Sequence, residues 1–214
     1  MTGIDLKSLI LNGFEKQDPE MHSKIINFQN FFKLSEITDE RYSITFLLDF
    51  FFKFNSNQIN PWALLNEIKF LEGRELLTRT KAATKFKRPP LKGLWHKHYY
   101  DGSINMLTNN LSNAIKKYQL PYFQQMIDEA KAAGEERFVQ IADIPHIVND
   151  AVSGNLQRRR DAGKITGEWI IYAIHDGKNY YLGLCEHSDP QEEIRRKIDM
   201  TCVLEFPFLE EILL

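Results

Sequence analysis

The stretch EWIIYAIHDGKNYYLGLC, residues 168–185, decides the fold. Two apolar runs rich in β-forming residues flank Asp176-Gly177, the dipeptide typical of a type I′ turn, so the sequence predicts an antiparallel hairpin. The turn sets the register and places His175 opposite Lys178. The run WIIYAI is apolar at consecutive positions, which favours a strand covered by helices on both faces.

The rest of the chain predicts helices before this hairpin. Residues 1–78 have helical apolar spacing, and Pro19 and Pro61 stand where the first residue of a helix is expected. Further along, TCVLEF, residues 201–206, suggests another strand. The fold class expected is α+β, with N-terminal helices followed by a small antiparallel sheet. The chain divides into 1–78 and 79–214, or forms one continuous domain, 1–214.

Composition points to an ordinary globular protein of the cytoplasm. Hydrophobic residues make up 43% of the 214 residues and charged residues 26%, as in most soluble domains. The N-terminus lacks the pattern of a signal peptide. The stretch ITFLLDFFFKF is interrupted by Asp49 and Lys53 and is too short to span a bilayer, so no membrane partner is expected. Cys185 and Cys202 allow one disulfide, but reduced thiols are expected in this compartment.

The stretch KFKRPPLKGLWHKHYYDGS, residues 85–103, carries the strongest charge signal. Between Glu75 and Asp101 lie seven Lys and Arg residues and no acid; removing them from the net charge of −2 leaves −9 on the rest. Such a segment neutralises phosphates, and an aromatic side chain within it stacks on unpaired bases. The predicted phosphate or nucleic-acid contacts are Lys85, Lys87, Arg88, Lys92, Trp95 and Lys97. A solvated loop docking on the protein's own acidic surface is the alternative.

His96 and His98 share one face if this segment is extended, because strand side chains alternate. Such a pair suits acid and base catalysis of phosphodiester cleavage, or two metal ligands. No nearby cysteine or acid completes a metal site, so neither a metal nor another cofactor is expected. A structural pair is the remaining alternative.

His187 ends the hairpin, where the predicted register places it opposite Thr166 and places Trp169 opposite Leu184. The connector NLQRRRDAGKITGE, residues 155–168, brings cations to this end of the sheet. We expect His187 and Arg159 to be catalytic there, because fixed cations beside a histidine suit a phosphate. Arg158, Arg160 and Lys164 are expected to bind phosphate. The alternative is that the arginines end a helix and complement its dipole. The sequence leaves open whether residues 85–98 fold over the His187 end.

Functional motifs of several enzyme classes are absent. There is no Walker loop, no Gly-x-Gly-x-x-Gly, no Gly-x-Ser-x-Gly and no His-Glu-x-x-His, which weakens assignments as ATPase, Rossmann oxidoreductase, serine hydrolase or zinc protease. In architecture alone, helices before an antiparallel sheet with scattered His, Arg and Lys resemble metal-independent ribonuclease toxins. The resemblance implies RNA as the ligand, with His187 or His96 and His98 as acid and base. The alternative is a non-catalytic interaction or regulatory protein whose basic segment docks on an acidic protein partner.

Overall fold

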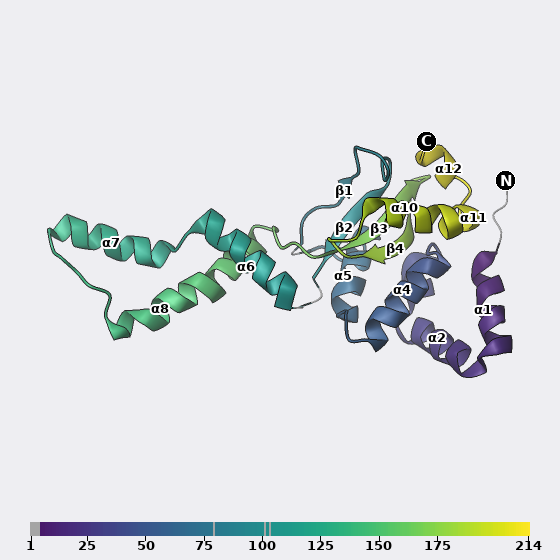
Figure 1. The fold of residues 1–214 in the computed structure, drawn as a ribbon, viewed down its shortest axis with the longest axis horizontal. Helices are drawn as coiled ribbons and strands as arrows, with labels where there is room; N and C mark the ends of the chain where they lie inside the picture. The colour runs from purple at the N-terminus through teal and green to yellow at the C-terminus, as the bar shows by residue number, and fades with distance from the viewer. Residues whose placement is uncertain (1–4, 79, 101, 103) are drawn as a thin grey trace.

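A four-stranded antiparallel sheet organises the residues that the computed structural model describes, which are 5–78, 80–100, 102 and 104–214 (Figure 1). The strand order follows the chain, and each strand pairs with the next one. The strands are β1 (Thr84–Lys85), β2 (Trp95–Tyr99), β3 (Glu168–His175) and β4 (Lys178–Cys185). With helices before, between and after the strands, the fold is α+β, as predicted.

The predicted β3–β4 hairpin forms, but its register holds only near the turn. His175 pairs with Lys178 as expected, whereas Trp169 lies opposite Cys185 and not opposite Leu184. A β-bulge at Leu182 causes the one-residue shift, since Tyr172 pairs with Tyr181 while Ile171 pairs with Gly183. The Leu182 carbonyl accepts a hydrogen bond from the Ser43 hydroxyl at 2.8 Å.

Helices surround the sheet, and two of them begin at the residues that the sequence indicates. The Asp18 side chain accepts from the Met21 N–H ahead of α2, and Asn60 accepts from the Trp62 and Ala63 N–H groups ahead of α5. Both helices have proline at an initial position, where its missing N–H costs nothing. The N-terminal helices are α1 (Leu6–Gln17), α2 (Pro19–Phe31), α3 (Leu34–Thr38), α4 (Ile44–Asn55) and α5 (Pro61–Leu71).

The helices bury both faces of the sheet, as the apolar run of β3 predicts. On one face, Ile170 and Tyr172 pack with buried residues of α2, α4 and α5. On the other face, Ile171 and Ala173 pack with the C-terminal helices. These are α10 (Gln191–Lys197), the π-helical turn η3 (Ile198–Cys202), α11 (Val203–Glu205) and α12 (Leu209–Ile212).

The prediction of a strand at residues 201–206 is wrong, because this segment continues the helical turns of η3 and α11. Cys202 is fully buried there, and its thiol lies 3.4 Å from the Leu182 carbonyl. Cys185 and Cys202 are both free thiols, as expected. Burial raises the pKa of Cys202 to about 11, so it stays a neutral thiol.

The basic segment is more regular than the sequence suggests. Residues 84–99 form β1 and β2 on either side of a loop, and β2 is an inner strand paired with β1 and β3. The adjacent prolines Pro89 and Pro90 and the lack of a clear period predict irregular structure from Arg79 to Lys97. This prediction is wrong for the strands; Arg79 itself lies outside the described residues. Backbone pairing with β3, such as His96 opposite Ile171, holds the segment in place.

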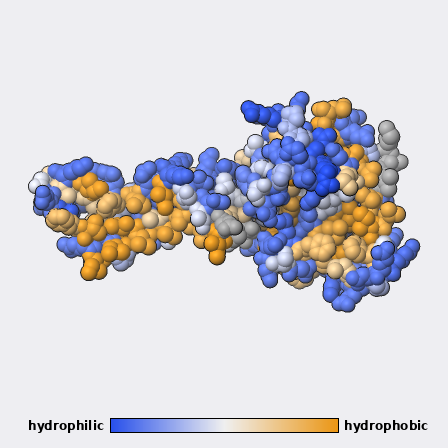
Figure 2. Space-filling model, in the orientation of Figure 1, coloured by the Kyte–Doolittle hydropathy of each residue, from blue (hydrophilic) through white to orange (hydrophobic). Residues whose placement is uncertain are grey.

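A helical arm, residues 104–161, extends away from the sheet between β2 and β3 (Figure 1). It consists of α6 (Ile104–Tyr118), α7 (Pro121–Ala133), η1 (Ile141–Asp143), α8 (Ile144–Asn149), η2 (Asp150–Gly154) and α9 (Asn155–Asp161). Figure 2 shows apolar residues gathered on it. Its exposed large apolar side chains are Ile104, Leu107, Ile115, Phe138, Val139, Ile141, Ile144, Val148 and Val152. Within the described ranges, no helix combines the length and the apolar character needed to cross a membrane.

Candidate functional site

Three histidines from distant parts of the sequence meet around one tryptophan. The Trp169 ring centroid lies 4.9 Å from that of His96, 6.3 Å from that of His98 and 4.5 Å from that of His187. The His98 and His187 rings stack at 5.7 Å, and His96 meets His98 edge-on at 5.5 Å. The basic segment and the His187 end of the hairpin therefore meet. We call these four residues the histidine cluster.

The sheet brings the cluster together. His96 and His98 alternate along β2 and lie on one face, as predicted for an extended segment. Pairing of His98 with Trp169 across β2 and β3 places the indole beside them. His187 follows the end of β4, and the Glu168 carboxylate accepts a hydrogen bond from its backbone N–H. The predicted pairing of His187 with Thr166 does not form, because the bulge in β4 shifts the register.

The hydrogen bonds of His98 fix the position of its proton. Its Nδ1 atom lies 2.6 Å from the Gly167 carbonyl oxygen, and the Gly167 N–H points at the same atom with its nitrogen 3.2 Å away. The two contacts favour opposite tautomers, because the carbonyl needs a proton on Nδ1 and the N–H needs a lone pair there. The carbonyl contact is the shorter one, so we assign the proton to Nδ1, which donates a hydrogen bond to the Gly167 carbonyl. In the neutral ring, Nε2 is then unprotonated and able to accept a proton.

Burial keeps the imidazoles of β2 neutral. The pKa of His96 is lowered to about 4, mainly by loss of hydration and to a smaller extent by the nearby His187 and Lys81. The pKa of His98 also falls to about 4, again mainly through burial, although the hydrogen bond to Gly167 opposes the shift. At neutral pH both rings are thus uncharged, which is the state of a general base.

Two buried polar atoms of the cluster lack a hydrogen-bond partner among the described residues. They are Nδ1 of His96 and Nε1 of Trp169, whose side chain is only 8% exposed. The indole nitrogen can only donate, and an unsatisfied buried donor in a folded protein calls for an explanation. A bound oxygen anion beside Trp169 would supply the missing acceptor.

A basic groove lies next to the cluster. Lys85, Lys87, Lys92 and Trp95 line a cavity of about 770 Å³, so four of the predicted phosphate contacts share one surface. Phe86 lines the same cavity, and its ring lies 4.7 Å from that of His96. The groove and the histidine cluster are thus joined through Phe86. Arg88 is exposed in the connecting loop and does not line the groove.

Lys97 lies inside the protein, away from this groove. Its ammonium is 3.0 Å from the Glu67 carboxylate and donates to the Thr80 hydroxyl at 2.6 Å and to the Lys81 carbonyl at 2.7 Å. The alternation that puts His96 and His98 on one face sends Lys97 to the other, toward α5. Its geometry gives a structural role, and it offers no free donor for a phosphate.

The three consecutive arginines have three different environments. Arg158 pairs with Asp150. Arg159 is buried and donates to Asn110 and to the Lys164 carbonyl, so its guanidinium links α6 to α9 and does not face the histidines. Arg160 is exposed and lines a different cavity.

Sequence reasoning missed two members of the site. In the sequence, Trp169 has only a place in the hairpin, and Lys81 only a place among the seven basic residues between Glu75 and Asp101. Lys81 lies close enough to lower the pKa of both β2 histidines, and the charges of Arg159 and Lys164 in turn act on Lys81. Lys164 is thus near Lys81, and its role as a phosphate ligand stays a prediction. The position of Trp169 in the hairpin was the one signal in the sequence that could have placed it in the site. That signal is useful only when β2 is known to be the neighbouring strand.

Nothing outside the chain itself indicates what this site does. In the part of the chain that is described, no group of three or more His, Cys, Asp or Glu side chains is arranged to hold a metal ion. Comparison of the chain with protein-family models, with curated proteins and with solved structures gives no match.

Proposed function

We propose that the protein binds RNA, or another polyphosphate, across the basic groove and cleaves a phosphodiester bond at the histidine cluster. The observation that carries the proposal is the meeting of His96, His98 and His187 around an indole N–H without an acceptor. Neutral imidazoles, a donor for an oxyanion and nearby cations are the groups that metal-independent RNA cleavage requires.

The geometry supports separate roles for the histidines. His98 Nε2 takes the proton from a ribose 2′-hydroxyl, whose oxygen attacks the adjacent phosphorus. The bond from phosphorus to the 5′-oxygen breaks, and protonated His187 gives its proton to that oxygen. The products are a 2′,3′-cyclic phosphate and a 5′-hydroxyl, and no oxidant or co-reactant is consumed.

Charge developing on the phosphate oxygens needs fixed donors. Trp169 Nε1 is the uncommitted buried donor, and Lys81 supplies a nearby positive charge. Trp169 and Lys81 take the catalytic role predicted for Arg159, because the Arg159 guanidinium already donates to Asn110 and to the Lys164 carbonyl. Lys85, Lys87 and Lys92 line a path for the flanking phosphates, and Trp95 is placed to stack on a base.

The test is cleavage of a single-stranded RNA in the presence of EDTA. The wild type should release a 2′,3′-cyclic phosphate, and His98→Ala and His187→Ala should each lower the rate at least 100-fold. A substrate with a 2′-deoxyribose at the cleaved position should remain intact. His146→Ala is the control, since that histidine lies on α8 of the arm.

The outcomes separate the candidate functions. Undiminished cleavage by both cluster variants would remove these histidines from the mechanism. Binding without cleavage, weakened by salt and by Lys87→Gln, would leave a polyanion-binding protein. Absence of RNA binding even at low salt would contradict the nucleic-acid function and favour an acidic protein partner for the basic groove.

A further inference from the structure

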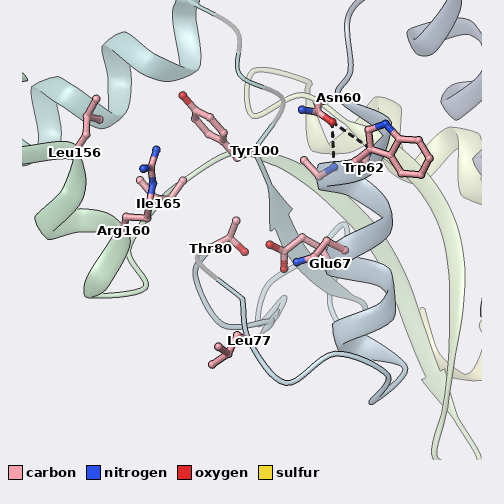
Figure 3. A pocket seen from close by; sticks show the side chains of 11 residues that line it. Asn60, Trp62, Glu67, Leu77, Thr80, Tyr100, Leu156, Arg160 and Ile165 are labelled. Atoms are coloured by element: carbon pink, nitrogen blue, oxygen red, sulfur yellow. Dashed lines mark hydrogen bonds between the residues drawn. The ribbon is translucent and has the colours of Figure 1, made fainter. Parts of the chain in front are cut away.

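A second cavity lies where the arm meets the body. It has a volume of about 710 Å³, within the range of small-molecule sites. Figure 3 shows Leu156 and Arg160 on the arm side, and across from them Trp62 and Glu67 on α5 with Asn60 just ahead of that helix. Glu67 is bonded to Lys97, whose side chain leaves β2 on the face away from His96 and His98. The cavity is therefore separate from the histidine cluster.

The cavity has one uncommitted cation. Arg158 and Arg159, its two neighbours in sequence, are held by Asp150 and Asn110. The Arg160 guanidinium, by contrast, has no hydrogen-bond or ion-pair partner recorded in the described residues, and it lines the cavity. An arginine fork placed at a cavity in this way suits a phosphate or carboxylate.

Glu67, the one acidic residue among the described residues that line the cavity, does not repel an anion bound at Arg160. The Glu67 carboxylate is paired with Lys97 at 3.0 Å and also accepts from the Thr78 hydroxyl. Its charge is thus balanced within the protein. The same wall carries the exposed side chain of Asn66, an amide able to pair with the edge of a base.

The rest of the lining suits a flat, largely apolar group. Its apolar and aromatic members are Trp62, Ala63, Leu77, Tyr100, Leu156 and Ile165, and Asn60 and Thr80 also belong to it. The Trp62 ring contacts those of Phe31 and Phe32, with centroids 6.4 and 5.5 Å away, and stays largely exposed, so it leaves an aromatic surface open. Aromatic side chains of this kind stack on nucleobases.

We infer that this cavity binds a nucleoside monophosphate unit, with the phosphate on Arg160 and the base against Trp62 and Tyr100. The unit is either a free nucleotide or one residue of an RNA chain, because both present the same phosphate and base. The inference goes beyond the cleavage reaction, since it uses none of the cluster histidines.

The experiment is calorimetric titration of the full chain with adenosine 5′-monophosphate, adenosine, inorganic phosphate and a four-residue 2′-O-methyl RNA, which the proposed reaction cannot cleave. The mononucleotide should bind with one site per chain, at least tenfold more tightly than adenosine or phosphate alone, and the RNA should show an Arg160-dependent component besides its binding in the basic groove. Arg160→Gln should weaken that binding at least tenfold, and so should Ala63→Leu, which fills part of the cavity. Arg74→Gln is the matched control, because Arg74 is exposed and outside the lining.

Each result bears on the inference. Tight binding of free nucleotide identifies a soluble ligand, whereas Arg160-dependent binding of the RNA alone identifies a residue of a chain. Equal affinity in wild type and Arg160→Gln, or no binding of either probe, would overturn it. His98→Ala should leave this binding intact, so the failure of cleavage and the failure of this site are distinguishable.

Discussion

Lys97 and Glu67 form an ion pair inside the protein, with 3.0 Å between Nζ and the carboxylate and side-chain exposures of 0% and 6%. The pair links the inner strand β2 to helix α5, and Thr78 and Thr80 complete its hydrogen bonds. Burial lowers the pKa of Lys97, while the charge of Glu67 and its hydrogen bond oppose that shift. A lysine from the most basic segment of the chain thus serves the fold.

Breaking this pair on one side should destabilise the protein strongly. Lys97→Met leaves the Glu67 carboxylate buried and unpaired, and we expect the free energy of unfolding to fall by about 3–5 kcal/mol. The double variant Lys97→Met with Glu67→Met should lose less than the two single losses added together. Urea denaturation measures all three. Lys85→Met, at an exposed position, should change stability by about 0.5 kcal/mol or less; a similarly small loss for Lys97→Met would contradict the structural role.

The β2 histidines make stability depend on pH in a defined direction. Both have a folded pKa of about 4, below the usual 6.5 or so. The unfolded chain therefore binds more protons between these values, and the free energy of unfolding falls as the pH drops from about 6.5 to 4. We expect a loss of about 2.5 kcal/mol for each histidine, and so about 5 kcal/mol from the pair, over this range.

The measurement compares wild type with a His96→Asn, His98→Asn double variant in urea at pH 7, 5.5 and 4. Comparison is needed because Glu205 acts in the opposite direction: burial raises its pKa to about 7, so its protonation stabilises the fold as the pH falls. The difference between the two proteins should shrink on acidification. A difference independent of pH would show that these histidines titrate normally.

Gly167 should tolerate no side chain. A Cβ atom there would lie 1.7 Å from the Tyr99 carbonyl oxygen, so Gly167→Ala forces β2 and β3 apart at the residue that holds His98. We expect destabilisation by about 2 kcal/mol or more and loss of RNA cleavage. Gly13 in α1 has open space around its Cα, so Gly13→Ala should stabilise by about 0.5–1 kcal/mol. Equal stability of the two variants, by thermal unfolding, would contradict this close approach.

The apolar side chains of the arm should contribute little to folding. Phe138 is 80% exposed and Ile141 is 87% exposed, so Phe138→Ser and Ile141→Ser remove few buried contacts. We expect unfolding midpoints close to wild type, together with weaker binding of a hydrophobic dye. Leu47→Ser, in the buried core, is the contrasting control and should unfold at a much lower urea concentration. A large midpoint shift in the arm variants would mean that these residues are covered.

Local chemistry made part of the fold predictable. The Asp176-Gly177 turn and the caps at Asp18 and Asn60 depend on residues a few positions apart, so the sequence alone indicates them. The bulge at Leu182 is hydrogen-bonded to Ser43, which is far away in the chain, so no local pattern signals it, and the predicted hairpin register is wrong beyond it.

The site shows the same division. The alternation of side chains along a strand correctly predicts that His96 and His98 lie on one face. The same alternation sends Lys97 to the other face. That this face is buried could be known only from the position of α5, which covers it. Arg159 is a residue type that often binds phosphate. Its guanidinium donates instead to Asn110 of the arm, which gives it a structural role. Trp169 acquires its importance from strand pairing with His98.

The position of the arm has a topological consequence. Tyr99 and Glu168 are direct partners across β2 and β3, so residues 100–167 amount to one very long hairpin loop that leaves and re-enters the sheet at adjoining points. Evolution can lengthen, shorten or exchange such a loop without rewiring the strands, because both of its ends are fixed side by side. Arg160 belongs to that loop, whereas Trp62 and Glu67 across the cavity belong to α5, and His96 and His98 belong to the sheet. Exchange of the loop would therefore alter one wall of the cavity and leave the β2 histidines in place.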